Sequence, residues 1–289
     1  MYRRSVITDE ISQDLDDVLD VARAFHLDGL EIRTVWNTRV DLLSNSQVSE
    51  LRAAVDAAGL VIAAVAPPFY KCDVDSPDER AQHLEILKRA IDVGERLGTH
   101  LVRTFTFWRK YPLEKIWARL IDAYAAPIEI ARASGALLAI ENEYACHVGT
   151  GRELARFVAE LAQPQARSLW DPCNAFFVPD AERPFPDGYQ AVRDQIVHVH
   201  LKDAARPNGS DRPSLTPVGE GDLDVRGQLA ALANDGYTRF VSLETHWRPA
   251  APLAEATVRL PGGRVFSENA AAATIRCLQN WDNILQTTG

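Results

Sequence analysis

The chain has 289 residues, 46% of them hydrophobic, and a formal net charge of −9. This length is within the range of a single α/β barrel with one large core, so we expect one domain over residues 1–289. The negative charge repels phosphate groups, which argues against nucleic acid and anionic membrane surfaces as partners.

Four cysteines are present, and no two of them form a C-x-x-C pair. This spacing favours a reduced, cytoplasmic protein over a secreted one. No apolar core follows the basic residues of the opening MYRRSVITDE, and no later stretch approaches the ~20 apolar residues that span a bilayer. We therefore expect no membrane segment.

Short β-branched runs alternate with longer stretches in which apolar residues recur at helical spacing. The predicted strands are residues 4–8, 29–33, 60–66, 101–106, 136–141, 167–171, 196–201 and 239–244. Helices are predicted between them, for example at 13–26 and 80–97. This alternation predicts a single closed (β/α)8 TIM barrel of parallel strands, with its active site at the C-terminal rim of the strands. No G-x-G-x-x-G motif follows the first strand, which argues against a dinucleotide-binding sheet.

Two connectors rich in Gly and Pro, 205–221 and 247–264, interrupt the alternation late in the chain. Because the pattern resumes after each of them, we interpret both as loops of the active-site face and not as linkers between domains. The outer helices and residues 247–264 also offer surfaces for a homo-oligomer, although no spacing selects one of them.

Polar residues gather at the ends of the predicted strands. They are Asp9, Glu10, Glu31, Arg33, Arg103, Glu141, Glu143, Asp171, His198, His200, Glu244 and His246. In a barrel these strand ends form one rim, so the side chains converge on one cavity. Alternation along the seventh strand directs His198, His200 and Lys202 to the same face.

Several buried acids in one cavity repel one another unless a cation neutralises them. Four of the strand-end residues form a candidate metal cluster: Glu141, Asp171, His200 and Glu244. Three carboxylates and one imidazole suit a divalent ion, and Mn²⁺ is the ion we expect, with Mg²⁺, Co²⁺ and Zn²⁺ as alternatives. A hydrogen-bond network without a metal is the competing interpretation, but it lacks enough positive partners for three acids.

Five segments occur in an order and at spacings that resemble those of a known family. They are LAIENEY, WDPCNAF, HVHLKDA, PVGEGDLD and YTRFVSLETHW. The chain resembles the sugar phosphate isomerase/epimerase family of xylose-isomerase-like barrels, which includes D-tagatose 3-epimerase and, more remotely, endonuclease IV. The resemblance implies that the candidate metal cluster holds a divalent ion and that its two glutamates also move protons on opposite faces of a sugar. The family commonly has a histidine three residues after the aspartate, where this chain has Asn174, so the substrate and the reaction stay open.

The implied chemistry removes a proton next to a carbonyl and returns it elsewhere, through an enediolate that a divalent ion stabilises. Glu141 and Glu244 are the expected acid and base. Because metal ligation lowers basicity, Glu143 or His246 is the alternative proton carrier. The leading function is therefore an isomerase or epimerase that acts on a small carbohydrate, a keto-sugar or related polyol.

Two other classes of function compete with this interpretation. One is a lyase or dehydratase that eliminates from a 3-keto-glycoside or an inosose, and the other is a non-catalytic sugar-binding barrel. A nuclease of the endonuclease IV type is disfavoured, because it would need more histidines than the seven present and a basic groove.

The residues expected to contact the substrate are Glu143, Asn174, His198, Lys202, Arg103 and His246. Several have a structural alternative. Lys202 is as readily paired with Asp203 or Glu220. His198 fits a neutral, hydrogen-bonded barrel histidine better than it fits a metal ligand.

Two arginines near strand ends, Arg33 and Arg103, are expected either to bind an anion or to pair with Glu31 and Glu10. His147 lies in the polar stretch EYACHVGTG, and we interpret it as a solvated loop residue.

Overall fold

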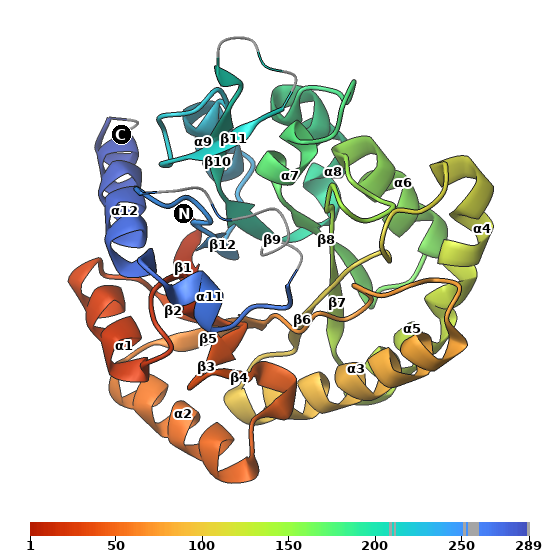
Figure 1. The fold of residues 1–289 in the computed structure, drawn as a ribbon, viewed down its shortest axis with the longest axis horizontal. Coiled ribbons are helices and arrows are strands. Elements are labelled where there is room, and N and C mark those ends of the chain that lie inside the picture. Colours follow the sequence, from red (N-terminus) through yellow and green to blue (C-terminus); the bar gives the residue numbers. More distant parts are fainter. Residues whose placement is uncertain (208–209, 211, 251–252, 254–259, 288–289) are drawn as a thin grey trace.

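The structure of the protein, a computed structural model, describes residues 1–207, 210, 212–250, 253 and 260–287. Parallel strands form a closed barrel in the order β1-β12-β9-β8-β7-β6-β5-β2, and helices surround it on the outside (Figure 1). This arrangement confirms the predicted (β/α)8 TIM barrel.

The barrel strands are β1 (Arg3–Ile7), β2 (Gly29–Ile32), β5 (Val61–Val65), β6 (Leu101–Thr104), β7 (Leu137–Glu141), β8 (Ala166–Trp170), β9 (Ile196–Leu201) and β12 (Phe240–Leu243). Their ends lie within two residues of the predicted ranges. The barrel closes because β1 pairs with both β2 and β12. At this closure the hydroxyl oxygens of Ser5 and Ser242 are 2.6 Å apart.

The strand β6 ends earlier than predicted, at Thr104 instead of residue 106. The chain turns out of the barrel there, because the backbone N–H groups of Phe105 and Phe107 donate to Phe69 O and Tyr70 O. Phe107 also has a left-handed φ of 61°, which is incompatible with a continued strand.

The helices are α1 (Leu15–Ala24), α2 (Asn45–Ala57), α3 (Pro77–Leu97), α4 (Leu113–Ala123), α5 (Ala125–Ser134), α6 (Gly151–Leu161), α7 (Pro172–Phe176), α8 (Tyr189–Val192), α9 (Val225–Asn234), α11 (Arg264–Ser267) and α12 (Ala270–Gln286). The start of α3 precedes the predicted residue 80, because Ser76 caps the helix and Pro77 fits its first turn. None of the helices in the described part of the chain is both long and apolar enough to cross a membrane.

The inside of the barrel is apolar in one layer and polar in the next. Side chains from five neighbouring strands form a small cluster of Ala64, Leu101, Ala139, Leu169 and Val197. Ala139 is two residues before Glu141 and therefore shares its face of β7. The polar residues consequently begin where this interior cluster ends, toward the C-terminal ends of the strands.

Two hairpins extend the C-terminal rim, and the sequence did not predict either of them. The strands β3 (Thr34–Val35) and β4 (Thr38–Arg39) pair after β2, and β10 (Asp203–Ala205) pairs with β11 (Ser214–Thr216) after β9. The second hairpin occupies most of the connector 205–221. The connector 247–264 follows β12 and lies partly outside the described residues.

Candidate metal centre and active site

The four residues of the candidate metal cluster come from four strands that are neighbours in the barrel. Glu141 is the last residue of β7, and His200 lies within β9. Asp171 directly follows β8, and Glu244 directly follows β12. Asp171 is also the cap of α7, because its Oδ1 accepts the backbone N–H of Asn174 at 2.9 Å, which fixes the carboxylate.

These four side chains meet around one point. The Nδ1 atom of His200 lies 3.3 Å from Glu141 Oε1, 3.4 Å from Glu244 Oε2 and 3.8 Å from Asp171 Oδ2. One ligand atom from each residue lies within 4.8 Å of the others, and all four residues are buried. Spacings of this size leave room for one ion bound to all of them.

The donor atoms themselves fit a divalent cation. Glu141 Oε2 and His200 Nδ1 are buried and have no hydrogen-bond partner among the described residues. Buried polar atoms without partners cost free energy unless a ligand satisfies them. Carboxylate oxygens with one imidazole nitrogen suit Mn²⁺ or Mg²⁺, and the residues present therefore fit the expected metal.

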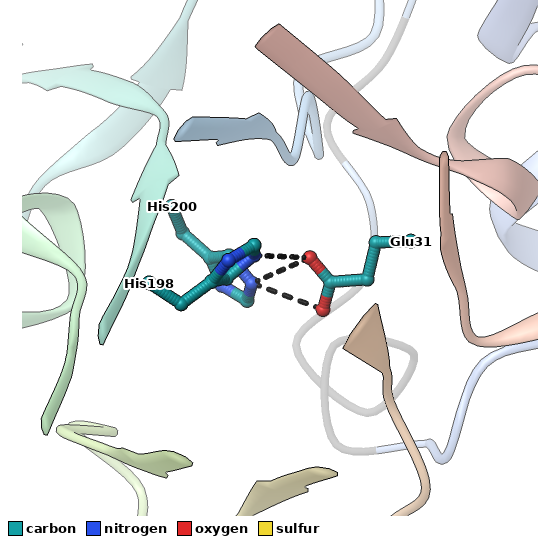
Figure 2. A group of neighbouring side chains, drawn as sticks. All are labelled: Glu31, His198 and His200. Carbon is teal, nitrogen blue, oxygen red and sulfur yellow. Dashed lines mark hydrogen bonds and ion pairs between the residues drawn. The ribbon is translucent and has the colours of Figure 1, made fainter. Parts of the chain in front are cut away.

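Glu31 orients His200 through Nε2, the ring nitrogen that is not the one near the acids, and Figure 2 shows its carboxylate facing both His200 and His198. Both carboxylate oxygens of Glu31 lie 3.2 Å from His200 Nε2, and Oε2 also lies 2.8 Å from His198 Nε2. A proton on Nε2 of His200 is held by this carboxylate, which leaves the lone pair of Nδ1 directed at the candidate metal cluster. Sequence reasoning placed Glu31 at a strand end but gave it no role toward His200.

Lys202 supplies positive charge to the same cluster. Its Nζ lies 2.7 Å from Asp171 Oδ2, and it donates to Glu244 Oε2 at 2.6 Å and to Asn174 Oδ1 at 3.2 Å. The expected pairing of Lys202 with Asp203 or Glu220 is wrong. Asp203 instead accepts the backbone N–H groups of a turn, and Glu220 pairs with Arg276 at 2.7 Å.

The charges in the cluster shift one another's pKa values. Burial raises the pKa of Asp171 to about 6, although Lys202 opposes this change. Burial also acts to raise the pKa of Glu244, but Lys202, His246 and His200 outweigh it and hold the pKa well below 4.5. Burial acts to lower the pKa of His200, but the surrounding glutamates raise it well above 6.5. Without a divalent ion, the imidazolium is therefore the favoured form of His200.

Arg33 and His246 connect Glu244 to Glu10. Arg33 donates to Glu244 Oε1 at 2.8 Å and to Glu10 Oε1 at 2.7 Å. The Nδ1 atom of His246 lies 2.6 Å from Glu10 Oε1. The expected pairing of Arg33 with Glu10 is thus present, whereas Arg103 lies beside Glu141 and Glu244 and not beside Glu31.

A cavity of about 570 Å³ opens above the cluster. Its wall includes seven of the residues that the sequence assigned to the site: Arg103, Glu141, Glu143, Asn174, Lys202, Glu244 and His246. A volume of this size is typical of small-molecule sites. The structure does not place His198 in this wall; it is fully buried and bonded to Glu31.

Glu143 reaches the cavity from the loop after β7. Lys71 donates to Glu143 Oε2 at 2.8 Å, and Lys71 also lines the cavity. The ammonium group of Lys71 lies 4.2 Å from the centre of the Phe105 ring. Sequence reasoning missed Lys71, and its position shortly after the third predicted strand was the only available signal.

Comparison with known proteins agrees with the barrel fold. Residues 19–279 match the model of the xylose isomerase-like TIM barrel family, and the chain belongs to that family. No curated protein matches the sequence.

Several solved structures share the fold over nearly the whole chain. An L-ribulose 3-epimerase has a TM-score of 0.74 at 17% identity, with 100% of this chain and 96% of that chain covered. The 3-keto-D-glucoside 4-epimerase of E. coli has a TM-score of 0.69 at 16% identity, with 95% of this chain and 99% of that chain covered. A xylose isomerase-like TIM barrel protein from Mycobacterium smegmatis, solved in complex with magnesium, has a TM-score of 0.67 at 17% identity, with 97% of each chain covered. At these identities the likeness shows the fold.

Proposed function

We propose that this protein is a divalent-metal-dependent isomerase or epimerase of a keto-sugar or related polyol. The observation that carries the proposal is the candidate metal cluster, whose unpartnered atoms Glu141 Oε2 and His200 Nδ1 lie beside a cavity of about 570 Å³, a size typical of small-molecule sites. The epimerases among the solved structures with this fold support the same class of reaction.

The chain's own side chains account for most of the proposed chemistry. When bound, a divalent ion would act as a Lewis acid toward the carbonyl of the sugar. Glu141 and Glu244, from the outer two of the four strands that supply the cluster, would take a proton from the carbon next to that carbonyl and return one. Lys202 and Arg103 in the cavity wall would stabilise the negative charge of the enediolate.

Glu143 and His246 are the alternative proton carriers. Glu244 accepts hydrogen bonds from Arg33 and Lys202, and these cations reduce its basicity. Among the described residues, Glu143 forms an ion pair with Lys71 alone, and it lies in the cavity wall outside the cluster. Either residue would act without giving up a metal bond.

Deuterium exchange with matched variants tests the proposal. Protein loaded with Mn²⁺ and incubated with ketoses in D₂O is expected to incorporate deuterium next to the carbonyl with no net loss of water. Glu141→Gln and Glu244→Gln are expected to lose both metal affinity and exchange. Exchange lost with metal retained in Glu143→Gln would move the proton carrier to that residue, and no exchange with any ketose would contradict the proposal.

A lyase that acts on a 3-keto-glycoside is the second candidate. A solved structure with this fold belongs to an epimerase of a 3-keto-D-glucoside, the class of compound from which such a lyase would eliminate. The same base next to a 3-keto group would expel a β-substituent instead of returning the proton. Incubation with 3-keto-glycosides separates the two, because a lyase releases the aglycone. The third alternative, a non-catalytic sugar-binding barrel, is opposed by the complete cluster.

We further propose Mn²⁺ as the resident ion, with Mg²⁺, Co²⁺ and Zn²⁺ as alternatives; a protein with the same fold was solved with magnesium. Elemental analysis of purified protein distinguishes them.

The four buried, unpaired cysteines support the proposed cytoplasmic location. The proposed homo-oligomer is tested by sedimentation.

A further inference from the structure

Two arginines lie beside the candidate metal cluster, and their hydrogen bonds differ. Each of the three nitrogens of Arg33 donates to a carboxylate, those of Asp9, Glu10 and Glu244. Arg103 has five N–H donors, and among the described residues only Ala66 O accepts one of them, at 3.2 Å from Nη2. Its Nε is buried and has no partner in the same residues.

Arg103 lies in the wall of the cavity where a substrate would bind. The side chain is 6% exposed and forms part of the cavity wall. Its Nη1 lies 3.7 Å from Glu141 Oε2 and 3.6 Å from Glu244 Oε1, which is too far for a hydrogen bond. The ring of Phe105 lies 4.9 Å from the guanidinium carbon. A buried guanidinium with so few partners is costly unless a ligand completes its hydrogen bonds.

The charge of the site points to an anionic ligand. Lys202 and Arg103 depend on the carboxylates of the candidate metal cluster for their counter-charge. Glu141, Asp171 and Glu244 carry three negative charges, so a divalent ion bound to them would leave one negative charge for the two cations, an excess of one positive charge. A neutral sugar does not restore the balance, whereas a negatively charged substrate does.

We propose that Arg103 binds a carboxylate of the substrate, so that the substrate class is the keto-sugar acids and not the neutral ketoses. This inference rests on the proposed metal-dependent function. The planar Nη1–Nη2 end of a guanidinium presents two parallel N–H donors, which match the two oxygens of a carboxylate. A guanidinium binds phosphate in the same way, but a phosphate dianion carries two negative charges, one more than the excess positive charge beside the metal.

Ligand binding to matched pairs of sugars tests the inference without relying on turnover. Mn²⁺-loaded protein is titrated calorimetrically with D-fructose and D-fructuronate, and then with D-tagatose and D-tagaturonate. Each acid is expected to bind at least about tenfold more tightly than its neutral partner. D-fructose 6-phosphate serves as the phosphate arm and is expected to bind less tightly than either acid.

Variants of Arg103 assign the preference to one side chain. Arg103→Met is expected to weaken binding of the acids by about tenfold or more and to weaken binding of the neutral ketoses much less. Arg103→Lys keeps the positive charge but loses the two parallel N–H donors, so it should retain only part of the preference for the acids. Arg23→Met, in an exposed ion pair on α1, is the control and should bind every ligand as the unaltered protein does.

Three results would overturn the inference. They are equal affinity of the unaltered protein for acids and neutral sugars, equal weakening of both by Arg103→Met, and tighter binding of the phosphate ester than of the acids. The first and third need no variant, so a variant that fails to fold leaves the inference testable. The proposed function is tested separately, because it fails if a direct metal titration shows no binding of Mn²⁺.

Discussion

Glu31 has no contact with the cavity, yet it determines which nitrogen of His200 faces the acids. Burial acts to raise the pKa of Glu31, but the adjacent rings of His200 and His198 outweigh it and hold the pKa well below 4.5, so Glu31 stays a carboxylate. This charge holds a proton of His200 on Nε2, so that Nδ1 is the nitrogen that would lose its proton to bind an ion.

Replacement of Glu31 by glutamine therefore has a defined consequence. Glu31→Gln keeps the size of the side chain but removes its charge, so the orientation of His200 is weakened. We expect the affinity for Mn²⁺ to fall by about 10–100-fold in a direct metal titration. Glu50→Gln, at an exposed position of α2, is the control. Unchanged affinity in Glu31→Gln would show that β9 alone positions the imidazole.

His147 gives a second prediction, on stability. The sequence indicated a solvated residue, but His147 is 1% exposed, and neither ring nitrogen has a partner among the described residues. Burial lowers its pKa to about 4, and Arg109 contributes in the same direction. The unfolded chain, with a pKa near 6.5, therefore binds this proton more readily than the folded chain. The contribution is fully present above about pH 6.5 and is lost as the pH falls toward 4.

The variant His147→Leu removes this proton uptake at nearly constant volume. We expect the free energy of unfolding of the unaltered protein, relative to His147→Leu, to be constant above about pH 7 and to fall steadily between about pH 6.5 and 4. Denaturant unfolding at a series of pH values measures the difference. A difference independent of pH would mean that the ring is protonated in both states or in neither.

At the scale of single residues, the sequence predicted which side chains reach the rim but not which of them meet. Strand ends converge in any barrel, so Glu141, Asp171, His200 and Glu244 were identifiable from their positions. The contact of Glu31 with His200 joins strands that are not neighbours in the barrel, and no local pattern encodes it. The burial of His147 depends in the same way on packing between loops, since its ring stacks with Tyr111.

Among the elements, α6 begins where the loop that carries Glu143 ends. Thr150 Oγ1 accepts the backbone N–H of Glu153 at 3.2 Å, and Glu153 Oε2 accepts those of Thr150 at 3.0 Å and Gly149 at 2.8 Å. This capping box satisfies the first turn of the helix. The loop is held further because Glu143 N donates to Val148 O at 3.0 Å.

Removal of the cap should affect both stability and the site. Thr150→Ala is expected to lower the free energy of unfolding by about 1 kcal/mol and to reduce turnover, because the loop that positions Glu143 is loosened. Ser44→Ala, at the equivalent capping box of α2, is the matched control; it should cost a similar stability without a change in turnover. Equal turnover in the two variants would show that the cap of α6 does not position the loop that carries Glu143.

The elements themselves were largely predictable, since strand and helix periodicities are local properties of a sequence. The predicted strand at 196–201 has the bounds of β9, because apolar residues frame its two histidines and the whole segment is buried. The hairpin of β10 and β11 was not predicted, because its pairing joins short, partly polar segments across a loop without alternation.

At the scale of the whole molecule, the candidate metal cluster takes its residues from one half of the barrel. The four strands that supply its residues lie side by side as β7, β8, β9 and β12. An ion bound there would cross-link segments of the chain from residue 141 to residue 244, and it would bind the folded state alone. Mass action then predicts stabilisation by about 2.7 kcal/mol at 100 times the dissociation constant.

This stabilisation should depend on pH in one direction. Asp171 must lose its proton to bind an ion, and its pKa is raised to about 6. His200 must also lose a proton, and its pKa is raised well above 6.5. Both requirements are met more easily as the pH rises, so the increase in melting temperature caused by Mn²⁺ should be large near pH 8 and small near pH 5.

Thermal unfolding with and without Mn²⁺ between about pH 5 and 8 measures this dependence. Calorimetric titration in two buffers of different ionisation enthalpy counts the protons released on binding, which should be at least about one near neutral pH. Treatment with EDTA should return the melting temperature to the metal-free value at each pH. An Mn²⁺ effect equally large at pH 5 and pH 8, with no proton released, would show that the ion binds somewhere other than Asp171 and His200.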